Sequence, residues 1–301
     1  MRDAAEHQAL VQSLKEEHFA EDLEPPAESC TWPAATLERW FENGGIGVLT
    51  VEEAPSARNG PLRVLGLHAF RSNANILAQQ RALSLQSELL KDLVEISLLD
   101  APYVCTAGDE AKAYPIVKKI FPTTKYGPYR EWFNAREVEA FHESEYEGEF
   151  ATYERLSEAV SHVTAALANA SPPFDGIMGF SQGGSLALLM CELQRSGRIQ
   201  CPPIGFVWIQ SSRMPRDPSV KDLFGSPLQI PALVCYHEDD TSVRPEETRK
   251  LIGRLASPDV ITRPKGGHSL LSLRDGESAD QVRRFLESVR DGPASAFGGT
   301  R

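Results

Sequence analysis

The segment FDGIMGFSQGGSLALLM, residues 174–190, decides the fold class. Its first part, 174–179, has the composition of a short buried strand, and the part after Ser181 has that of an apolar helix. Between them stands Gly179-Phe180-Ser181-Gln182-Gly183, a G-x-S-x-G pattern whose glycines permit a sharp turn that holds the serine hydroxyl clear of the backbone. Its place between a strand and a helix favours a nucleophilic serine over the alternative, a helix-capping serine without chemistry.

The same succession of strand and helix extends on both sides of this segment. We expect strands at 62–67, 93–99, 174–179, 204–210, 232–236 and 259–264, and helices at 73–90, 152–170, from 181, at 245–256 and at 280–290. Strands that are apolar throughout and alternate with helices favour a parallel sheet covered on both faces. The sequence therefore predicts an α/β fold with a doubly wound, mostly parallel sheet.

Three regions are expected along the chain. Residues 1–60 form an N-terminal arm, partly ordered, with apolar helical spacing near residues 10–14 and a short helix near 36–41. Residues 61–290 form the main domain, and residues 291–301 form a flexible tail.

A nucleophilic serine needs a base, and in α/β-hydrolases the acid and then the histidine follow the serine along the chain. Of the seven histidines, His237 and His268 follow Ser181. His268 lies in a glycine loop, 265–269, just after the last expected strand, where doubly wound folds place their sites. His268 is thus the expected base, and His237 is interpreted as a loop histidine.

The acid is expected just beyond the strand at 232–236, where Glu238, Asp239 and Asp240 are consecutive. An apolar residue three positions after Asp240, and a proline that opens the next helix, favour Asp240. Asp239 stays open as the alternative, and Glu238 is expected to be solvated.

The oxyanion of a tetrahedral intermediate needs two backbone N–H donors. One is expected from Gln182, the residue after the nucleophile, and the other from the loop after the first strand, at Phe70. His68 lies in the same loop, and the alternative to a part in the site is that it only packs and forms local hydrogen bonds.

Seven motifs in order resemble those of the FSH family of serine hydrolases: LHAFRSNANIL, LLDAP, REWFN, YERLSEAV, FDGIMGFSQGG, DDTSVRPEE and GGHSLL. The resemblance covers residues 62–290 and implies an α/β-hydrolase that cleaves esters or thioesters without a cofactor. It implies Ser181 as nucleophile, Asp240 as acid and His268 as base. Two positions depart from the family pattern, since Ala69 and His237 stand where glycines are usual.

Residues 101–150 are too long for an ordinary connection and are rich in aromatic side chains. This composition favours a lid-like insertion that lines a pocket, with Tyr103, Trp132 and Phe133 as candidate substrate-binding residues. The alternative is that Trp132 and Phe133 are hydrophobic core beneath a loop.

The overall composition excludes several classes. With 31 basic and 42 acidic residues the net charge is −11, which argues against nucleic acid and anionic membrane surfaces as partners. No apolar run is long enough for a membrane span, and the N-terminus has no apolar signal core. Five dispersed cysteines indicate neither a disulfide framework nor a metal site, so a cytoplasmic location and no metal are expected.

The function predicted from the sequence is a serine esterase that acts on a small-molecule carboxylic ester through an acyl-enzyme. One alternative is a thioesterase acting on acyl-CoA or carrier-bound chains. Another is a non-catalytic binding protein that keeps the fold. The oligomeric state is left open.

Overall fold

The computed structural model describes residues 4–17, 60–85, 90–111, 113–137 and 151–291. Contacts divide the chain into two units, Met1–Ser56 with Thr300–Arg301, and Ala57–Gly299. In the first unit the described part is the helix α1 (Ala4–Glu17). The short helix expected near 36–41, the tail from residue 292 and the second part of the insertion, 138–150, lie outside the described residues.

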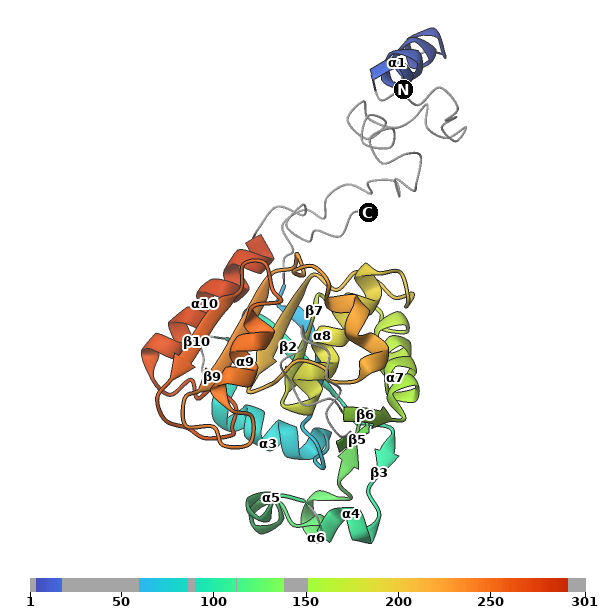
Figure 1. The fold of residues 1–301 in the computed structure, drawn as a ribbon. Coiled ribbons are helices and arrows are strands. Elements are labelled where there is room, and N and C mark those ends of the chain that lie inside the picture. Colours follow the sequence, from blue (N-terminus) through green and yellow to red (C-terminus); the bar gives the residue numbers. More distant parts are fainter. Residues whose placement is uncertain (1–3, 18–59, 86–89, 112, 138–150, 292–301) are drawn as a thin grey trace. The chain divides into compact units, whose positions relative to one another are not determined.

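The second unit is built on a parallel sheet of six strands (Figure 1). They are β1 (Leu62–Leu67), β2 (Val94–Leu99), β7 (Gly176–Phe180), β8 (Phe206–Gln210), β9 (Ala232–His237) and β10 (Asp259–Arg263). Their order in the sheet is β10-β9-β8-β7-β1-β2, and every neighbouring pair is parallel. The fold class predicted from the sequence is confirmed.

The strand order places a topological switch between β1 and β7. The chain leaves β1 toward β2 on one side, and it later returns to β7 on the other side. Loops that follow two strands at such a switch turn away from each other and leave a crevice at the carboxyl edge. The loop after β1 and the turn at Ser181 are therefore neighbours, although more than a hundred residues separate them in the sequence.

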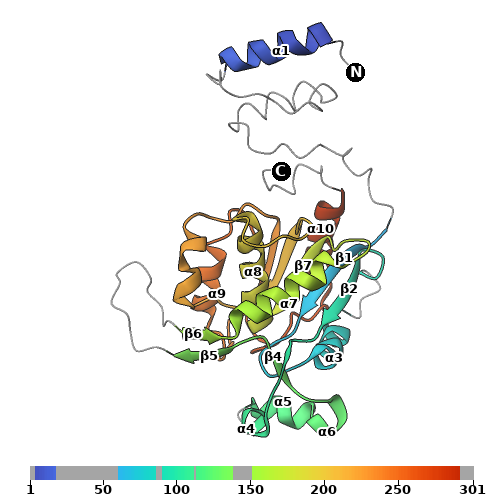
Figure 2. The same ribbon diagram turned by 90° about the vertical axis from the view of Figure 1, so that its right-hand side faces the viewer.

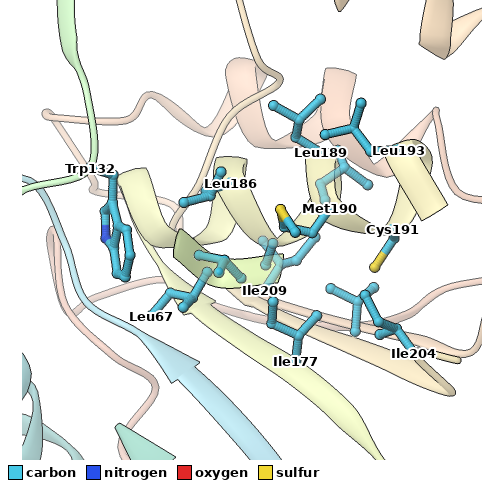
Figure 3. Close-up of a cluster of buried hydrophobic side chains, with 14 of the residues drawn as sticks. Leu67, Trp132, Ile177, Leu186, Leu189, Met190, Cys191, Leu193, Ile204 and Ile209 are labelled. Carbon is cyan, nitrogen blue, oxygen red and sulfur yellow. The ribbon is translucent and has the colours of Figure 1, made fainter. Parts of the chain in front are cut away.

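Helices cover both faces of the sheet (Figures 1 and 2). They are α3 (Ala74–Leu85), α7 (Leu156–Ala168), α8 (Gln182–Arg195), α9 (Pro245–Ile252) and α10 (Gly276–Asp291), together with the 3-10 helix η2 (Pro218–Phe224). Because side chains alternate along a strand, Leu65 and Leu67 of β1 pack in one hydrophobic cluster, and Leu62 and Val64 pack in another. The first cluster is shared with α7 and α8 (Figure 3) and the second with α10.

Several element boundaries differ from the sequence-based expectation. The helix expected over 152–170 begins only at Leu156, because β6 (Ala151–Glu154) precedes it and pairs with β5 (Asn134–Glu137) in an antiparallel ribbon. The last helix begins at Gly276 instead of 280, where the Asp275 carboxylate accepts a hydrogen bond from the Ser278 N–H.

The described part of the insertion has its own small elements. They are β3 (Tyr103–Val104), α4 (Ala107–Ala111), α5 (Pro115–Ile120), α6 (Thr123–Tyr126) and β4 (Arg130–Glu131), with β3 and β4 paired antiparallel. Both views place α4, α5 and α6 beyond one end of the sheet (Figures 1 and 2). Across the described parts of the chain, no helix combines the length and the apolar character that crossing a bilayer requires.

Candidate active site

Ser181 stands on a strained turn between β7 and α8. Its φ of 54° lies in the left-handed region, which a residue with a side chain rarely adopts. The Ser181 N–H donates to the Gln210 carbonyl of β8 at 2.9 Å, and the Ser212 hydroxyl donates to the Ser181 carbonyl at 2.7 Å. These bonds fix the backbone on both sides of the side chain, so the hydroxyl direction is set by the fold.

Two glycines make this turn possible. A side chain at Gly179 would collide with the backbone of Gly183 and Gly184, and one at Gly183 would collide with the carbonyl groups of Leu67 and His68. The start of α8 therefore packs directly on the end of β1. The G-x-S-x-G spacing reflects these two close backbone approaches.

The structure brings the three predicted triad residues together. The Ser181 Oγ lies 2.9 Å from His268 Nε2, and His268 Nδ1 lies 2.8 Å from Asp240 Oδ2. Asp240 is buried, whereas the His268 side chain keeps 16% of its surface exposed. A buried acid, a partly accessible imidazole and a partly buried serine thus form a continuous hydrogen-bonded chain.

The three consecutive carboxylates after β9 have three different partners. Asp240 Oδ1 accepts the N–H groups of Ser242 and Val243, at 2.8 and 2.9 Å, while its second oxygen faces His268. Asp239 instead accepts the Gly267 N–H at 2.7 Å and so holds the glycine turn before His268. Glu238 forms an ion pair with Arg249 at the surface.

Burial and hydrogen bonding act in opposite directions on Asp240. Burial alone would raise the pKa of this carboxyl group. The bond from His268 and the two backbone N–H groups together outweigh burial, so the pKa of Asp240 is below its ordinary value. Asp240 is thus ionised at neutral pH and can orient and stabilise a protonated imidazole.

Two candidate backbone N–H donors lie in the segments that meet at this edge of the sheet, the start of α8 and the loop after β1. Gln182 is the first residue of α8, and the first N–H groups of a helix have no intrahelical acceptor. Phe70 lies in the loop after β1, and within the described part of the chain neither its N–H nor that of Gln182 donates a hydrogen bond. Both groups are the donors expected for an oxyanion hole.

The loop that carries Phe70 is held by a buried arginine that the sequence analysis did not single out. Arg71, with a φ of 49°, directs its guanidinium to Glu131 at 3.5 Å and to Asp109 at 3.6 Å. Both carboxylates belong to the insertion, and Arg71 and Glu131 are buried. Ser72 and Arg130 also form a β-bridge through two backbone hydrogen bonds. The oxyanion loop and the insertion are therefore joined by side chains and by backbone.

His68 has a structural role. It is fully buried, its Nδ1 bonds to the Ala69 carbonyl at 2.8 Å, and its Nε2 accepts the Ala101 N–H at 2.9 Å. Burial lowers the pKa of His68 to about 4. A neutral imidazole with the proton on Nδ1 therefore connects the loop after β1 to the start of the insertion.

The predicted substrate-binding aromatics lie in three different settings. Trp132 is 0% exposed and belongs to the cluster beneath α8 (Figure 3), where its indole N–H donates to the His68 carbonyl at 2.8 Å. Phe133 is buried and stacks on Tyr153 with 4.2 Å between ring centroids. Tyr103 is half-buried, with the Arg155 guanidinium 4.5 Å from its ring centroid. The placement of Trp132 and Phe133 favours the core alternative for both residues.

Gln182 has a second function in the structure through its side chain. The amide nitrogen donates to the Phe133 carbonyl at 2.7 Å, and the amide oxygen accepts the Trp132 N–H at 3.1 Å. The residue that offers one candidate oxyanion donor thus also holds the insertion against α8.

Two aromatic neighbours of His268 were also missed by the sequence analysis. The Phe180 ring stacks on the imidazole with 5.1 Å between centroids, and the Tyr114 ring, which precedes α5, lies 6.3 Å away. Tyr114 is 44% exposed. Its position was not predictable from local sequence, because it depends on how the insertion folds back over the carboxyl edge.

His237, at the end of β9, supports the turn before His268. It is buried, and a side chain at Gly266 would collide with its ring. Gly266 has a φ of 150°. Burial lowers the pKa of His237, so this histidine is uncharged at neutral pH. Among the described residues, no group of three or more His, Cys, Asp and Glu side chains is arranged to hold a metal ion.

Comparison with known proteins decides the class. Residues 58–274 match the model of the family described as serine hydrolase (FSH1). The chain belongs to this family. It is an enzyme, a serine hydrolase, and the family membership expected from the seven motifs is confirmed.

The curated relatives include animal esterases. The esterase OVCA2 of Bos taurus is 31% identical over 233 residues, which cover 76% of this chain and 97% of the relative. The esterase OVCA2 of Mus musculus is 28% identical, with the same coverage of both chains. Among solved structures, Zea mays acyl-protein thioesterase 2 is similar with a TM-score of 0.50 and 16% identity, covering 76% of this chain and 95% of that one. That likeness shows the α/β-hydrolase type of fold.

Proposed function

We propose that this hydrolase cleaves carboxylic esters through Ser181, His268 and Asp240. The Ser181 oxygen attacks the ester carbonyl carbon while its proton passes to His268 Nε2. The imidazolium then protonates the leaving alkoxide, and an acyl-enzyme on Ser181 remains. Water that loses a proton to His268 attacks this acyl group, releases the acid and restores the serine.

The two free N–H groups support the oxyanion in this scheme. The carbonyl oxygen becomes an alkoxide in each tetrahedral intermediate and accepts hydrogen bonds from Phe70 and Gln182. The helix α8 also presents the positive end of its dipole to this charge. Asp240 keeps the proton of His268 on Nδ1, which leaves Nε2 free to accept the serine proton.

The observation that carries the proposal is the hydrogen-bonded chain of 2.9 and 2.8 Å from Ser181 through His268 to Asp240. It starts from a serine on a strained turn in a chain of a serine hydrolase family. Of the two carboxylates considered for the acid, Asp240 faces the imidazole and Asp239 faces a backbone N–H.

The experiment combines labelling and turnover. A fluorophosphonate probe is expected to label the wild-type protein and not Ser181→Ala. On p-nitrophenyl esters, Ser181→Ala, His268→Ala and the double variant are each expected to lose on the order of 10³-fold or more in kcat, because triad members act as a unit. Full turnover by Ser181→Ala would refute the mechanism.

Asp240→Asn and Asp239→Asn form a matched pair that tests the acid. Asp240→Asn is expected to lower kcat on the order of 10³-fold, because an amide no longer holds the catalytic tautomer of His268. Asp239→Asn removes a charge from one backbone hydrogen bond and is expected to cost only a few-fold, about 1 kcal/mol. The opposite ranking in the kinetics would make Asp239 the acid.

The leaving group is the finer part of the proposal. An oxygen ester is the class named for the animal relatives, and a thioester would pass through the same acyl-enzyme on Ser181. Turnover of oxygen esters and thioesters with the same acyl chain, over a series of chain lengths, ranks the two leaving groups. We expect the oxygen esters to have the higher kcat/KM.

A further inference from the structure

In the part of the chain that the structure describes, the exposed large apolar side chains are concentrated in the insertion. Five large hydrophobic residues are exposed among those that the structure describes, and four of them lie in the insertion: Val104 at 51%, Tyr114 at 44%, Ile116 at 59% and Ile120 at 52%. The fifth, Val260, is 42% exposed on the edge strand β10. Exposed apolar groups that gather in one short segment indicate a contact surface.

The helix α5 separates its apolar residues into two sets. Phe121, at its end, packs with Tyr129 in the small core of the insertion, and Val117 packs against that core. Ile116 and Ile120, four positions apart, share a different side of the helix and face solvent. Since the core of the insertion is already formed without these two isoleucines, their exposure is not explained by folding. We call Ile116 and Ile120, together with Lys119 next to them around the helix, the α5 face.

The charge of this segment is opposite to that of the whole chain. Residues 111–129 contain four lysines and no acidic residue, while the net charge of the chain is −11. Lys118 and Lys119 are exposed on α5 itself, and Lys118 uses one N–H for the Ala111 carbonyl at 2.7 Å. An exposed pair of isoleucines next to lysines is the composition of segments that rest on anionic lipid surfaces.

The α5 face is close to the candidate active site. Tyr114, immediately before α5, has its ring centroid 6.3 Å from that of His268. In both views α4, α5 and α6 project beyond the sheet, so α5 can meet a flat surface (Figures 1 and 2). A lipid surface on the α5 face would therefore lie beside the catalytic histidine.

We propose that the α5 face docks on an anionic lipid–water interface, and that the site takes acyl esters presented at that interface. The second half of this proposal rests on the proposed esterase function, whereas the docking does not. A second copy of the chain fits this surface less well. In a twofold interface the α5 face would meet its own copy, so two surfaces of the same positive charge would be brought together.

The docking is tested by flotation with vesicles. The protein carrying Ser181→Ala, which cannot consume a substrate, is mixed with vesicles of phosphatidylcholine alone or with one part phosphatidylserine to two parts phosphatidylcholine. We expect it to float with the anionic vesicles and not with the neutral ones, because each lysine near an anionic surface strengthens binding by about fivefold.

Variants of the α5 face identify the contact. Lys119→Gln is expected to weaken binding by about fivefold, and Ile116→Asp with Ile120→Asp more than about 100-fold. Val260→Asp is the control, since it places the same charge on another exposed apolar side chain, 42% exposed on β10, and is expected to leave binding unchanged. No binding by the parent protein, or equal loss in Val260→Asp, would overturn the docking. A dimer in sedimentation that Ile116→Asp with Ile120→Asp dissolves would also overturn it.

The link to the reaction is tested with an active protein. With Ser181 intact, both α5 variants are expected to hydrolyse the water-soluble p-nitrophenyl acetate at the wild-type rate, which also shows that they fold. On a long-chain ester dispersed in the anionic vesicles, the turnover rate of each variant is expected to fall by the same factor as its affinity for the vesicles. Vesicle binding without any such loss would refute presentation of the substrate at the interface and would leave the docking intact.

Discussion

At the scale of single residues, His268 and His68 show how differently two histidines of one chain can be placed. His268 keeps part of its surface exposed and one nitrogen facing the Ser181 hydroxyl, as the proposed exchange of protons during turnover requires. His68 is buried with both nitrogens bonded inside the protein, so any added proton would break a bond and charge a dry site. Burial and partner atoms, which local sequence does not show, separate a catalytic from a structural imidazole.

The lowered pKa of His68 predicts a loss of stability in acid. Its folded pKa is about 4, below the ordinary 6.5, so the unfolded chain binds the proton more tightly. The contribution of His68 is complete above about pH 6.5 and falls as the pH drops toward 4. Between pH 7.5 and pH 5 the loss is about 2 kcal/mol.

Urea unfolding at these two pH values measures this effect. His68→Asn is expected to show a pH dependence of the unfolding free energy smaller than that of the wild type by about 2 kcal/mol. An NMR titration of the wild type provides an independent check that does not require the variant to fold. A His68 imidazole that becomes protonated near pH 6.5 would contradict the assignment.

At the scale of elements, the insertion is attached where the reaction needs rigidity. The Arg71 guanidinium, the β-bridge at Ser72 and the Gln182 side chain all connect the insertion to a segment that carries a candidate oxyanion donor. The sequence predicts the insertion as a lid. Its described part instead holds the two segments that carry the candidate oxyanion donors.

Arg71→Gln tests this support. Losing the ion pairs to Glu131 and Asp109 is expected to let the Phe70 N–H drift from the carbonyl oxygen, lowering kcat by about 10- to 100-fold with little change in KM. A trifluoromethyl ketone, which forms a tetrahedral alkoxide on the serine, is expected to bind more weakly by the same factor.

Arg130→Gln is the matched control for Arg71→Gln. It also breaks an ion pair of the insertion, with Asp100 at 3.5 Å, and the other hydrogen bond of its side chain goes to the Ala101 carbonyl and not to the loop of Phe70. It is expected to leave kcat and inhibitor binding within about twofold of the wild type. Equal losses in both variants would mean that Arg71 acts only through general stability.

Trp132 allows the two interpretations of the insertion to be separated. Because its side chain is 0% exposed and packs beneath α8, Trp132→Ala is expected to lower the unfolding free energy by about 3–5 kcal/mol. Turnover of short and long p-nitrophenyl esters is expected to fall by one common factor. A selective loss on long chains would restore Trp132 as part of an acyl pocket.

At the scale of the whole molecule, the sequence predicts the individual strands and helices better than the contacts between residues far apart in the chain. The strand at 62–67 and the turn at Ser181 can be predicted because they depend on local features, the run of apolar residues and the spacing of the glycines. The ribbon of β5 and β6, the ties of Arg71 and the position of Tyr114 depend on residues far apart in the chain. The net charge of −11 likewise gives no indication of the basic segment 111–129, because a total for the chain does not show where the charges lie.

The division of the chain into units gives a prediction at the same scale. The sheet begins at β1, both hydrophobic clusters draw on residues from Leu62 onward, and the triad lies between residues 181 and 268. A shortened protein that begins at Arg58, close to the boundary at Ala57, keeps all of these groups. We therefore expect it to fold and to turn over p-nitrophenyl acetate within about twofold of the full chain, because no candidate catalytic atom is removed.

Steady-state kinetics and thermal unfolding of the two proteins measure this expectation. A melting temperature within a few degrees of that of the full chain is expected, since the described residues of both clusters begin at Leu62. Shortening the chain further, to begin at Gly66, serves as the opposite control. It deletes most of β1, including Leu62 and Val64 of the second cluster, and is expected not to fold. If the protein beginning at Arg58 lost turnover while its melting temperature stayed unchanged, residues 1–57 would have to take part in the reaction, and the site drawn from residues 70–268 would be incomplete.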